Sequence, residues 1–380
     1  MILMDYSDNM NKESLYIENF GPLKKINLDN ITPFTIFVGE SGSGKSTIMK
    51  ILVLFRYFYK KVVIRSYLRN SGISKSQFKF KFDFFIKNNG FEGYISDKTV
   101  IVYKRGNYNI EYKNGKLNPN ITVTDEDLSL DKMSYISDKR NIIPDILAKT
   151  VSVSNQNMYL NETWNDFQEA TSDFNLIDIP YLGVSLNKKK TQNGVKFVVK
   201  NDVEKNDSYE IAFADSSSGM QNVAPLVTIL DYFINRYDLI ASFNRAILSN
   251  LSDSDMLSKF RPELDIGKIK YKNLFFHIEE PELSLYPSTQ TELISQIVKL
   301  CFENEAARFN TYCTITTHSP YVVNYLNLLI KQKRIAFDDI SVYEVLAGHL
   351  RSLKNTDKNV IDTTLLSEPI SRIYEEYNRL

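Results

Sequence analysis

The sequence is poor in cysteine, has no net charge and lacks long apolar runs. Its two cysteines, Cys301 and Cys313, lie in apolar segments without metal-ligand spacing, so we expect reduced core thiols in a cytoplasmic protein. Acidic and basic side chains number 46 each, which gives no support for a nucleic-acid field over the whole protein. No run approaches about 18 apolar residues, so we expect no membrane partner. The first residues carry acids and no long apolar stretch, which argues against secretion.

One local stretch departs from this neutral balance. Residues 56–81 carry eight basic side chains and no acid, with aromatic residues between them. Such a stretch can follow the phosphate backbone of DNA or RNA, and it can equally be a solvated helix face. The sequence leaves both interpretations open. A long heptad segment is absent, which excludes extended coiled-coil arms.

One segment fits a phosphate-binding loop at every fixed position of G-x-x-x-x-G-K-[ST]. The apolar run 34–38 precedes it, and apolar residues at helical spacing follow. Glycines let successive backbone N–H groups surround phosphate oxygens, and the new helix adds unpaired amides and its positive dipole end. We expect Lys45 to reach the β- and γ-phosphates and Ser46 to hold Mg²⁺. The predicted ATP-binding residues are Gly39, Glu40, Ser41, Gly42, Ser43, Gly44, Lys45, Ser46 and Thr47.

Two later apolar strands supply groups that a phosphate loop lacks. Glu279 and Glu280 follow directly after the apolar residues 273–278, and neighbouring strand residues point to opposite faces. We therefore expect Glu279 to face Mg²⁺ or its water, and Glu280 to polarise the attacking water as general base. Residues 312–316 deliver His318 to the carboxyl end of their strand, which is the ligand side of an open α/β sheet. The predicted catalytic residues are Glu280, His318 and Lys45.

Two further positions each have two interpretations. Ser218 and Gln221 have capping-box spacing before an amphipathic helix, and capping alone would explain them. A serine-capped helix N-terminus is also an anion site, so Ser218, Gly219 and Gln221 would then meet a phosphate held by another subunit. Phe20, in a turn between two short strands, either lies near the nucleotide base or covers the sheet edge.

The remaining patterns predict further elements of the chain. Residues 141–174 are expected to be mostly helical, with Trp164 as a packing residue, and 195–199 with 209–213 to form a hairpin. Alternating apolar residues and Asn-Gly turns predict an antiparallel meander after the first helix. Its strands are expected at 78–82, 93–95, 100–103 and 108–112.

The ordered motifs resemble an ABC-type ATPase head of the RecF/SMC/OLD kind, and most closely the OLD-like ATPases of bacterial anti-phage systems. Residues 279–287, EEPELSLYP, resemble that family's E-E-P-E-x-x-L-H-P, and residues 316–320 match its T-T-H-S-P. Residues 217–221, SSGMQ, resemble its signature, and residues 17–23 its opening strand and turn. The resemblance covers residues 15–47 and 209–326, with a family-like tail from Ser341.

This resemblance implies the fold. We expect an α/β class fold, an ABC-type P-loop ATPase head, with a mixed β-sheet, helices on both faces and an inserted antiparallel β lobe. The whole chain, residues 1–380, would be one discontinuous ATPase domain. Its insertions are expected at 56–130 as a basic helix and β lobe, at 141–208 as helices and a hairpin, and at 237–270 as a variable helical segment.

The resemblance also implies a function. Two heads would close around two ATP molecules, with Mg²⁺ as metal cofactor, in a dimer or a higher homo-oligomer, and hydrolysis would open them. The first hypothesis is a switch subunit in anti-phage defence that controls a separately encoded nuclease or toxin. A RecF-like role in DNA repair or maintenance is an alternative. An ABC transporter subunit is disfavoured by the long gap from Lys45 to Ser218 and by E-E-P-E in place of a D-E-P form.

The sequence departs from the family pattern at three places. Tyr286 stands where the family usually has histidine, which leaves that position without a role. No glutamine equivalent to the ABC Q-loop is identifiable, and Arg140, at the end of the stretch in the expected place, has no assigned role. The stretch after His318 is shorter than the Toprim nuclease domain of OLD enzymes, so we expect no such domain.

Overall fold

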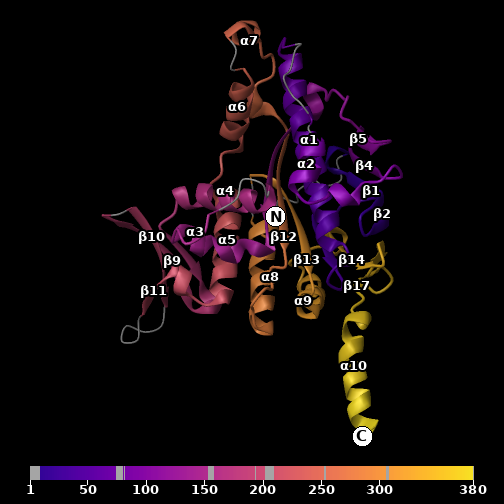
Figure 1. Ribbon diagram of the computed structural model, residues 1–380, viewed down its shortest axis with the longest axis vertical. Coiled ribbons are helices and arrows are strands. Elements are labelled where there is room, and N and C mark those ends of the chain that lie inside the picture. The colour runs from indigo at the N-terminus through magenta and orange to yellow at the C-terminus, as the bar shows by residue number, and fades with distance from the viewer. Residues whose placement is uncertain are drawn as a thin grey trace.

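A mixed sheet of 11 strands forms the centre of the chain (Figure 1). The computed structural model describes residues 9–73, 80, 82–152, 158–192, 194–201, 209–251, 254–304 and 308–379. Parallel neighbours lie in the order β14-β3-β13-β12-β7. Their bounds are Ile340–Leu346 for β14, Phe34–Val38 for β3, Asn310–Thr317 for β13, Tyr271–Glu279 for β12 and Ser129–Ile136 for β7. Every residue of β3 and β7 is buried, so both faces are covered here, as is usual for parallel strands.

The rest of the sheet is largely antiparallel and continues in the order β6-β5-β4-β1-β2-β15. Neighbouring strands from β6 to β2 pair antiparallel, and β15 joins this half to β14. The bounds are Glu13–Phe20 for β1, Leu23–Leu28 for β2, Val100–Arg105 for β4, Tyr108–Lys113 for β5, Lys116–Asn118 for β6 and His349–Ser352 for β15. The expected α/β mixed sheet is confirmed, and its antiparallel insertion extends the main sheet rather than forming a detached lobe.

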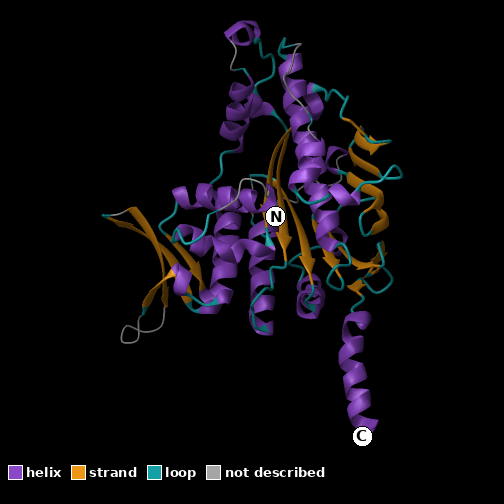
Figure 2. Cartoon of the chain, viewed as in Figure 1, coloured by secondary structure: helices purple, strands orange, loops and turns teal. Residues whose placement is uncertain are grey.

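Helices from both halves of the chain cover the parallel strands (Figure 2). Helix α1 (Lys45–Asn70) contacts β7, β12 and β13, and α8 (Pro287–Phe302) contacts β13. Helix α5 (Ser218–Asn235) contacts α8, β12 and α4 (Met158–Ser172), which packs on β7. The other helices are α2 (Phe82–Asn88), α3 (Ile143–Leu147), α6 (Leu239–Asn250), α7 (Ser254–Lys259), α9 (Pro320–Lys331) and α10 (Thr364–Arg379).

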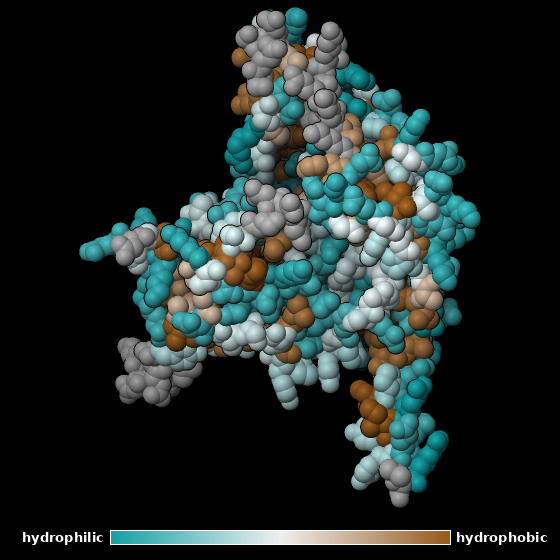
Figure 3. Space-filling model, in the orientation of Figure 1, coloured by the Kyte–Doolittle hydropathy of each residue, from teal (hydrophilic) through white to brown (hydrophobic). Residues whose placement is uncertain are grey.

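Two features lie at the edges of this body. A small antiparallel sheet has the order β11-β10-β9-β8, with bounds Leu176–Ile179 (β8), Val184–Thr191 (β9), Gly194–Asn201 (β10) and Glu210–Ala212 (β11). Strands β16 (Lys354–Asn355) and β17 (Val360–Ile361) precede α10, which projects from the body (Figure 1). Apolar side chains, Ile370 and Ile373 among them, are exposed on α10 (Figure 3). Among the described residues, no helix is long and apolar enough to cross a membrane.

The predicted meander is right in its second half and wrong in its first. Strands β4 and β5 form where expected, but Phe82 begins helix α2 and residues 92–94 form a 3₁₀ turn. The Phe82 ring stacks on Tyr112 at 4.3 Å and meets Phe55 and Phe58 of α1. This aromatic packing against α1 outweighs the local alternation of phenylalanine and lysine. Residues 78, 79 and 81 lie outside the described part of the chain.

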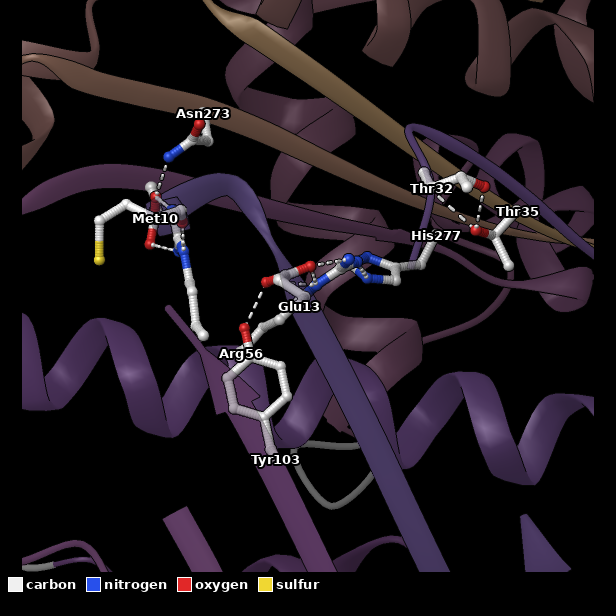
Figure 4. Close-up of polar contacts among 10 residues, drawn as sticks. Met10, Glu13, Thr32, Thr35, Arg56, Tyr103, Asn273 and His277 are labelled. Atoms are coloured by element: carbon white, nitrogen blue, oxygen red, sulfur yellow. Dashed lines mark hydrogen bonds and ion pairs between the residues drawn. The ribbon is translucent and has the colours of Figure 1, made fainter. Parts of the chain in front are cut away.

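A buried polar network anchors the phosphate-loop helix to both halves of the sheet (Figure 4). Arg56 of α1 pairs with Glu13 of β1, which also accepts a hydrogen bond from Tyr103 of β4. Arg56 Nη1 lies 2.8 Å from His277 Nε2, and His277 Nδ1 lies 3.1 Å from Ser134 O. Because arginine can only donate and a carbonyl can only accept, the ring carries its proton on Nδ1. His277 is therefore a neutral core residue.

This network predicts a dependence of stability on pH. Burial and the neighbouring Arg56 hold the pKa of His277 well below its usual range. The unfolded chain, with an ordinary histidine pKa of about 6.5, therefore binds more protons as pH falls below that value. The free energy of unfolding should fall by up to about 1.4 kcal/mol per pH unit from this group alone.

Denaturant titrations between pH 7 and pH 5 test this prediction. H277Q removes the histidine contribution, so its stability deficit relative to the unmodified chain should shrink as pH falls. H349Q is the matched control, since His349 is exposed at the start of β15. The same pH slope in H277Q and in the unmodified chain would contradict the assignment.

Candidate nucleotide site

The phosphate loop lies between β3 and α1, and its glycines are required by the backbone. Helix α1 begins at Lys45, with Gly44 as N-cap at a φ of 108°. A Cβ at Gly44 would lie 2.6 Å from Leu23 Cδ2, and one at Gly39 would lie 2.7 Å from Val345 O. Both positions also have positive φ, which other residues rarely adopt. The motif therefore forms the loop that its glycines predict.

Polar groups of this loop fit a bound polyphosphate. Lys45 Nζ donates to Gly39 O at 2.9 Å and to Glu40 O at 2.8 Å, so the cation is folded into the loop. Burial lowers the pKa of Lys45, an effect that Glu280 and Glu282 oppose. Ser43 Oγ is buried and has no hydrogen-bond partner among the described residues. A lysine inside the loop, an unsatisfied hydroxyl and a helix N-terminus form a donor set that suits phosphate oxygens.

Strand register brings the predicted catalytic groups to the edge that carries the loop. Val38, the last residue of β3, pairs with Thr317 of β13, and Thr316 pairs with Glu279 of β12. The phosphate loop, His318 and Glu280 therefore follow three neighbouring parallel strands at the same edge. This edge is where open α/β sheets bind ligands.

Glu280 and His318 meet at this edge. His318 Nε2 lies 3.3 Å from Glu280 Oε1, and both side chains are partly exposed, at 33% and 26%. Glu280 has a φ of 42°, in the left-handed region, and its N–H donates to Thr316 O at 2.9 Å. A non-glycine residue held in this region costs of the order of 1–3 kcal/mol and is typical of functional sites. The geometry suits a carboxylate base assisted by histidine.

Glu279 is engaged by groups that sequence reasoning missed. Its Oε1 lies 3.0 Å from Lys50 Nζ, and its Oε2 accepts a hydrogen bond from Asp138 N at 3.4 Å. Both carboxylate oxygens thus have partners within the chain, and the metal roles of Glu279 and Ser46 stay predictions. Lys50 follows Ser46 by four residues and so lies on the same side of α1, but nothing in the sequence links it to Glu279.

Glu282, in the segment 279–287, contacts the segment 316–320 that carries His318. Its Oε1 accepts hydrogen bonds from Thr317 Oγ1 and from His318 N, each at 2.7 Å. Its Oε2 is buried without a partner among the described residues. The carboxylate thereby fixes the backbone of His318, and it was missed because nothing in its spacing indicates a contact with β13. Tyr286, four residues later, is 77% exposed.

The signature segment differs from the predicted capping box. The N-cap is Ser217, whose side chain accepts a hydrogen bond from Met220 N, and Ser218 is the first, exposed residue of α5. Gln221 Nε2 donates to Ala214 O and Ser216 O, so this side chain holds the preceding loop. Ser218 is therefore free of the capping role that competed with its role as an anion site.

For Phe20 and for the basic stretch 56–81, where the sequence left two interpretations open, the described residues show internal packing. Phe20 is fully buried and meets the rings of Phe91 and Tyr94 edge-on, which favours the interpretation that it covers the sheet edge. In the basic stretch, Arg56 pairs internally with Glu13, and Arg65 donates to backbone carbonyls at residues 119 and 121. Arg56 and Arg65 are therefore engaged inside the protein, and residues 74–79 and 81 of this stretch lie outside the described part of the chain.

The sheet, the phosphate loop and the acids on its carboxyl edge define a P-loop ATPase domain. Residues 34–324 match the family described as "AAA domain, putative AbiEii toxin, Type IV TA system". This match spans most of the sequence, and the chain belongs to that family. No curated protein sequence shows significant similarity to it.

Solved structures similar to the chain include ATPase heads and ATP-binding cassettes. An SMC head bound to the C-winged helix domain of ScpA has 13% identity and a TM-score of 0.34, covering 91% of this chain and 98% of that one. The SMC head domain from Thermotoga maritima has 12% identity and a TM-score of 0.32, covering 90% and 97%. A nucleotide-free ATP-binding cassette from an ABC transporter has 11% identity and a TM-score of 0.33, covering 92% and 94%.

Proposed function

We propose that the chain binds ATP with Mg²⁺ and hydrolyses it as a switch subunit of an anti-phage defence system. The observation that carries the ATPase part is the alignment of Lys45, Glu280 and His318 at the carboxyl ends of three adjacent parallel strands. Lys45 and the loop amides hold the phosphates, and Ser46 with Glu279 would hold the metal ion. Bound Mg²⁺ would neutralise charge on the phosphates. Glu280, oriented by His318, accepts the proton of the attacking water.

We propose further that two copies complete the site, as a dimer or within a larger homo-oligomer. Ser218 stands at the exposed N-terminus of the 18-residue helix α5, where N–H groups and the helix dipole favour an anion. Its own capping need is met by Ser217, which leaves the Ser218 hydroxyl available. In this arrangement Ser218 of one copy contacts the γ-phosphate held by the partner copy.

The defence role rests on the OLD-like motifs and on the family description. The OLD-like pattern is associated with anti-phage systems, and the family description names a toxin of a type IV toxin–antitoxin system. No group of three or more histidine, cysteine, aspartate or glutamate side chains among the described residues can hold a metal ion for a second reaction. We therefore infer that ATP-dependent closure acts on a separately encoded nuclease or toxin through differential contacts.

A co-expression experiment tests the effector part of this proposal. We expect normal growth when the chain is expressed alone, and growth arrest on phage challenge only when the product of the adjacent gene is present. The purified chain, supplied with Mg²⁺ or Mn²⁺, should leave DNA and RNA intact. Arrest by the chain alone, retained in K45A, would instead support a toxin role for the chain itself. Degradation of nucleic acid by the pure chain would contradict a separate effector and show that the chain itself is a nuclease.

A further inference from the structure

Arg140 is a fully buried cation whose hydrogen-bond partners among the described residues are backbone carbonyls. Its Nη1 donates to Ser137 O at 3.0 Å and to Glu279 O at 2.7 Å. Its Nη2 donates to Glu280 O at 2.8 Å, and its Nε donates to Asn222 O at 2.9 Å. These carbonyls belong to three separate parts of the chain: the loop after β7, the end of β12 and the second turn of α5. The Arg140 guanidinium therefore connects helix α5 to the backbone of Glu280.

Burying such a cation is unfavourable, so other interactions must compensate for the lost solvation. The hydrogen bonds and ion pairs of the described residues include no carboxylate partner for Arg140, although buried charges are usually paired. Burial lowers the pKa of Arg140 to about 10, an effect that the carboxylates of Glu282, Asp138, Glu279 and Glu280 oppose, and the group stays protonated at neutral pH. The planar fork of arginine offers five donors in fixed directions, which a lysine or a neutral side chain does not reproduce.

On the catalytic side, Arg140 completes the clamp on the Glu280 backbone. The Glu280 N–H is held by Thr316 O, its carbonyl is held by Arg140 Nη2, and its φ lies in the left-handed region. Contacts on both sides of the residue are what maintain such a conformation. This backbone geometry sets the direction in which the Glu280 side chain leaves the main chain, and its Oε1 lies 3.3 Å from His318 Nε2.

On the helix side, the contacts lead to Ser218. Asn222 Nδ2 donates to Ser218 O at 2.9 Å, so the residue that accepts from Arg140 also holds the first turn of α5. The same turn lies against the loop after Glu280, because a Cβ at Gly219 would lie 3.1 Å from Ser284 O. A displacement of the first turn of α5 therefore reaches Glu280 through Arg140 and through this loop.

We propose that Arg140 is a positioning residue that couples the first turn of α5 to the orientation of Glu280. This inference rests on the proposed ATPase function and on Ser218 meeting the partner copy's nucleotide. Contact of Ser218 with the partner's nucleotide then brings Glu280 into the orientation for hydrolysis. A single copy without its partner would bind ATP but not hydrolyse it. A misplacement of a catalytic group by about 1 Å lowers rate by roughly 10²-fold, which is the size of effect that the coupling can control.

The test compares two buried arginines. R140K keeps the charge but loses the fork, and R105K makes the same change at Arg105, a buried residue that pairs with Asp131. We expect R140K to lower kcat about 10²-fold with an unchanged KM for ATP. R105K should keep kcat at temperatures where both variants are folded. In an E280Q background R140K should cause no further loss, because the base that it positions is already absent.

The outcomes separate this inference from the proposed function. Equal losses in R140K and R105K that follow their melting temperatures would show a purely structural role and overturn the inference. Should R140K not fold, N222A removes the hydrogen bond from Asn222 Nδ2 to Ser218 O and keeps the backbone carbonyl that accepts from Arg140. A lower kcat is expected if the first turn of α5 acts on Glu280, and an unchanged kcat would contradict that coupling. If the unmodified chain hydrolyses ATP and R140K does so equally well, the inference alone is wrong. No hydrolysis by the unmodified chain would overturn both.

Discussion

Replacing Glu280 by glutamine is expected to stop ATP hydrolysis while leaving ATP bound. Glutamine keeps the shape of the side chain that lies 3.3 Å from His318 but cannot accept a proton from water. A positioned general base contributes typically 10² to 10⁴ in rate, so kcat should fall by about that factor. Nucleotide affinity should stay near that of the unmodified chain, because the phosphate contacts belong to the loop and Lys45. Phosphate release and retention of labelled ATP measure the two quantities separately.

The neighbouring acid provides the control for this experiment. E279Q also removes a carboxylate, but one whose oxygens are engaged by Lys50 and by Asp138 N. We expect E279Q to weaken the Mg²⁺ dependence of ATP binding and to lower stability through the loss of the ion pair with Lys50. Normal hydrolysis in E280Q together with no hydrolysis in E279Q would mean that the roles of the two acids are reversed.

Replacing Lys45 by alanine is expected to remove ATP binding. The Lys45 ammonium lies inside the phosphate loop, held by the carbonyls of Gly39 and Glu40, and it is the charge available to neutralise the β- and γ-phosphates. A charge-assisted hydrogen bond is worth about 1.5–3 kcal/mol, so affinity should fall by roughly 10²-fold or more when Lys45 loses its contacts with both phosphates. A ligand that binds only the folded state raises the melting temperature. ATP should therefore raise the melting temperature of the unmodified chain and not that of K45A.

A second lysine of the same helix is the matched control for K45A. Lys61 lies on α1 beyond the loop, with its ammonium 4.7 Å from the centre of the Tyr57 ring. K61A should keep the stabilisation by ATP. Equal ATP stabilisation in K45A and in the unmodified chain would mean that nucleotide binds elsewhere or not at all.

Local motifs predicted the parts of the site that lie close together in sequence. The loop glycines, the double acid and the histidine each follow an apolar strand, and the rule that ligands bind at carboxyl ends of parallel strands placed them on one edge. The hydrophobic periodicity also predicted β4, β5, β12 and β13. These predictions succeed because strand and loop patterns are local, and the register of a parallel sheet then brings the strand ends together.

Contacts between distant segments were not predictable in the same way. Lys50 with Glu279, Glu282 with His318 N, and the carbonyl partners of Arg140 connect residues whose separation in sequence carries no periodic signal. Phe82 shows the opposite failure, since a local alternation pattern indicated a strand and packing on α1 produced a helix. Long-range packing decides both kinds of case.

The measurement that tests the central claim most directly is ATP hydrolysis by a mixture of two inactive variants. K45A cannot hold nucleotide, and S218R places a bulky side chain at the exposed start of α5 without removing its Ser217 cap. A mixed dimer would place both defects in one composite site and leave the other site intact. In an equal mixture with random pairing in a two-fold dimer, we expect about a quarter of the unmodified activity to return. No recovery, with mixed dimers shown to form, would contradict a site shared between two copies.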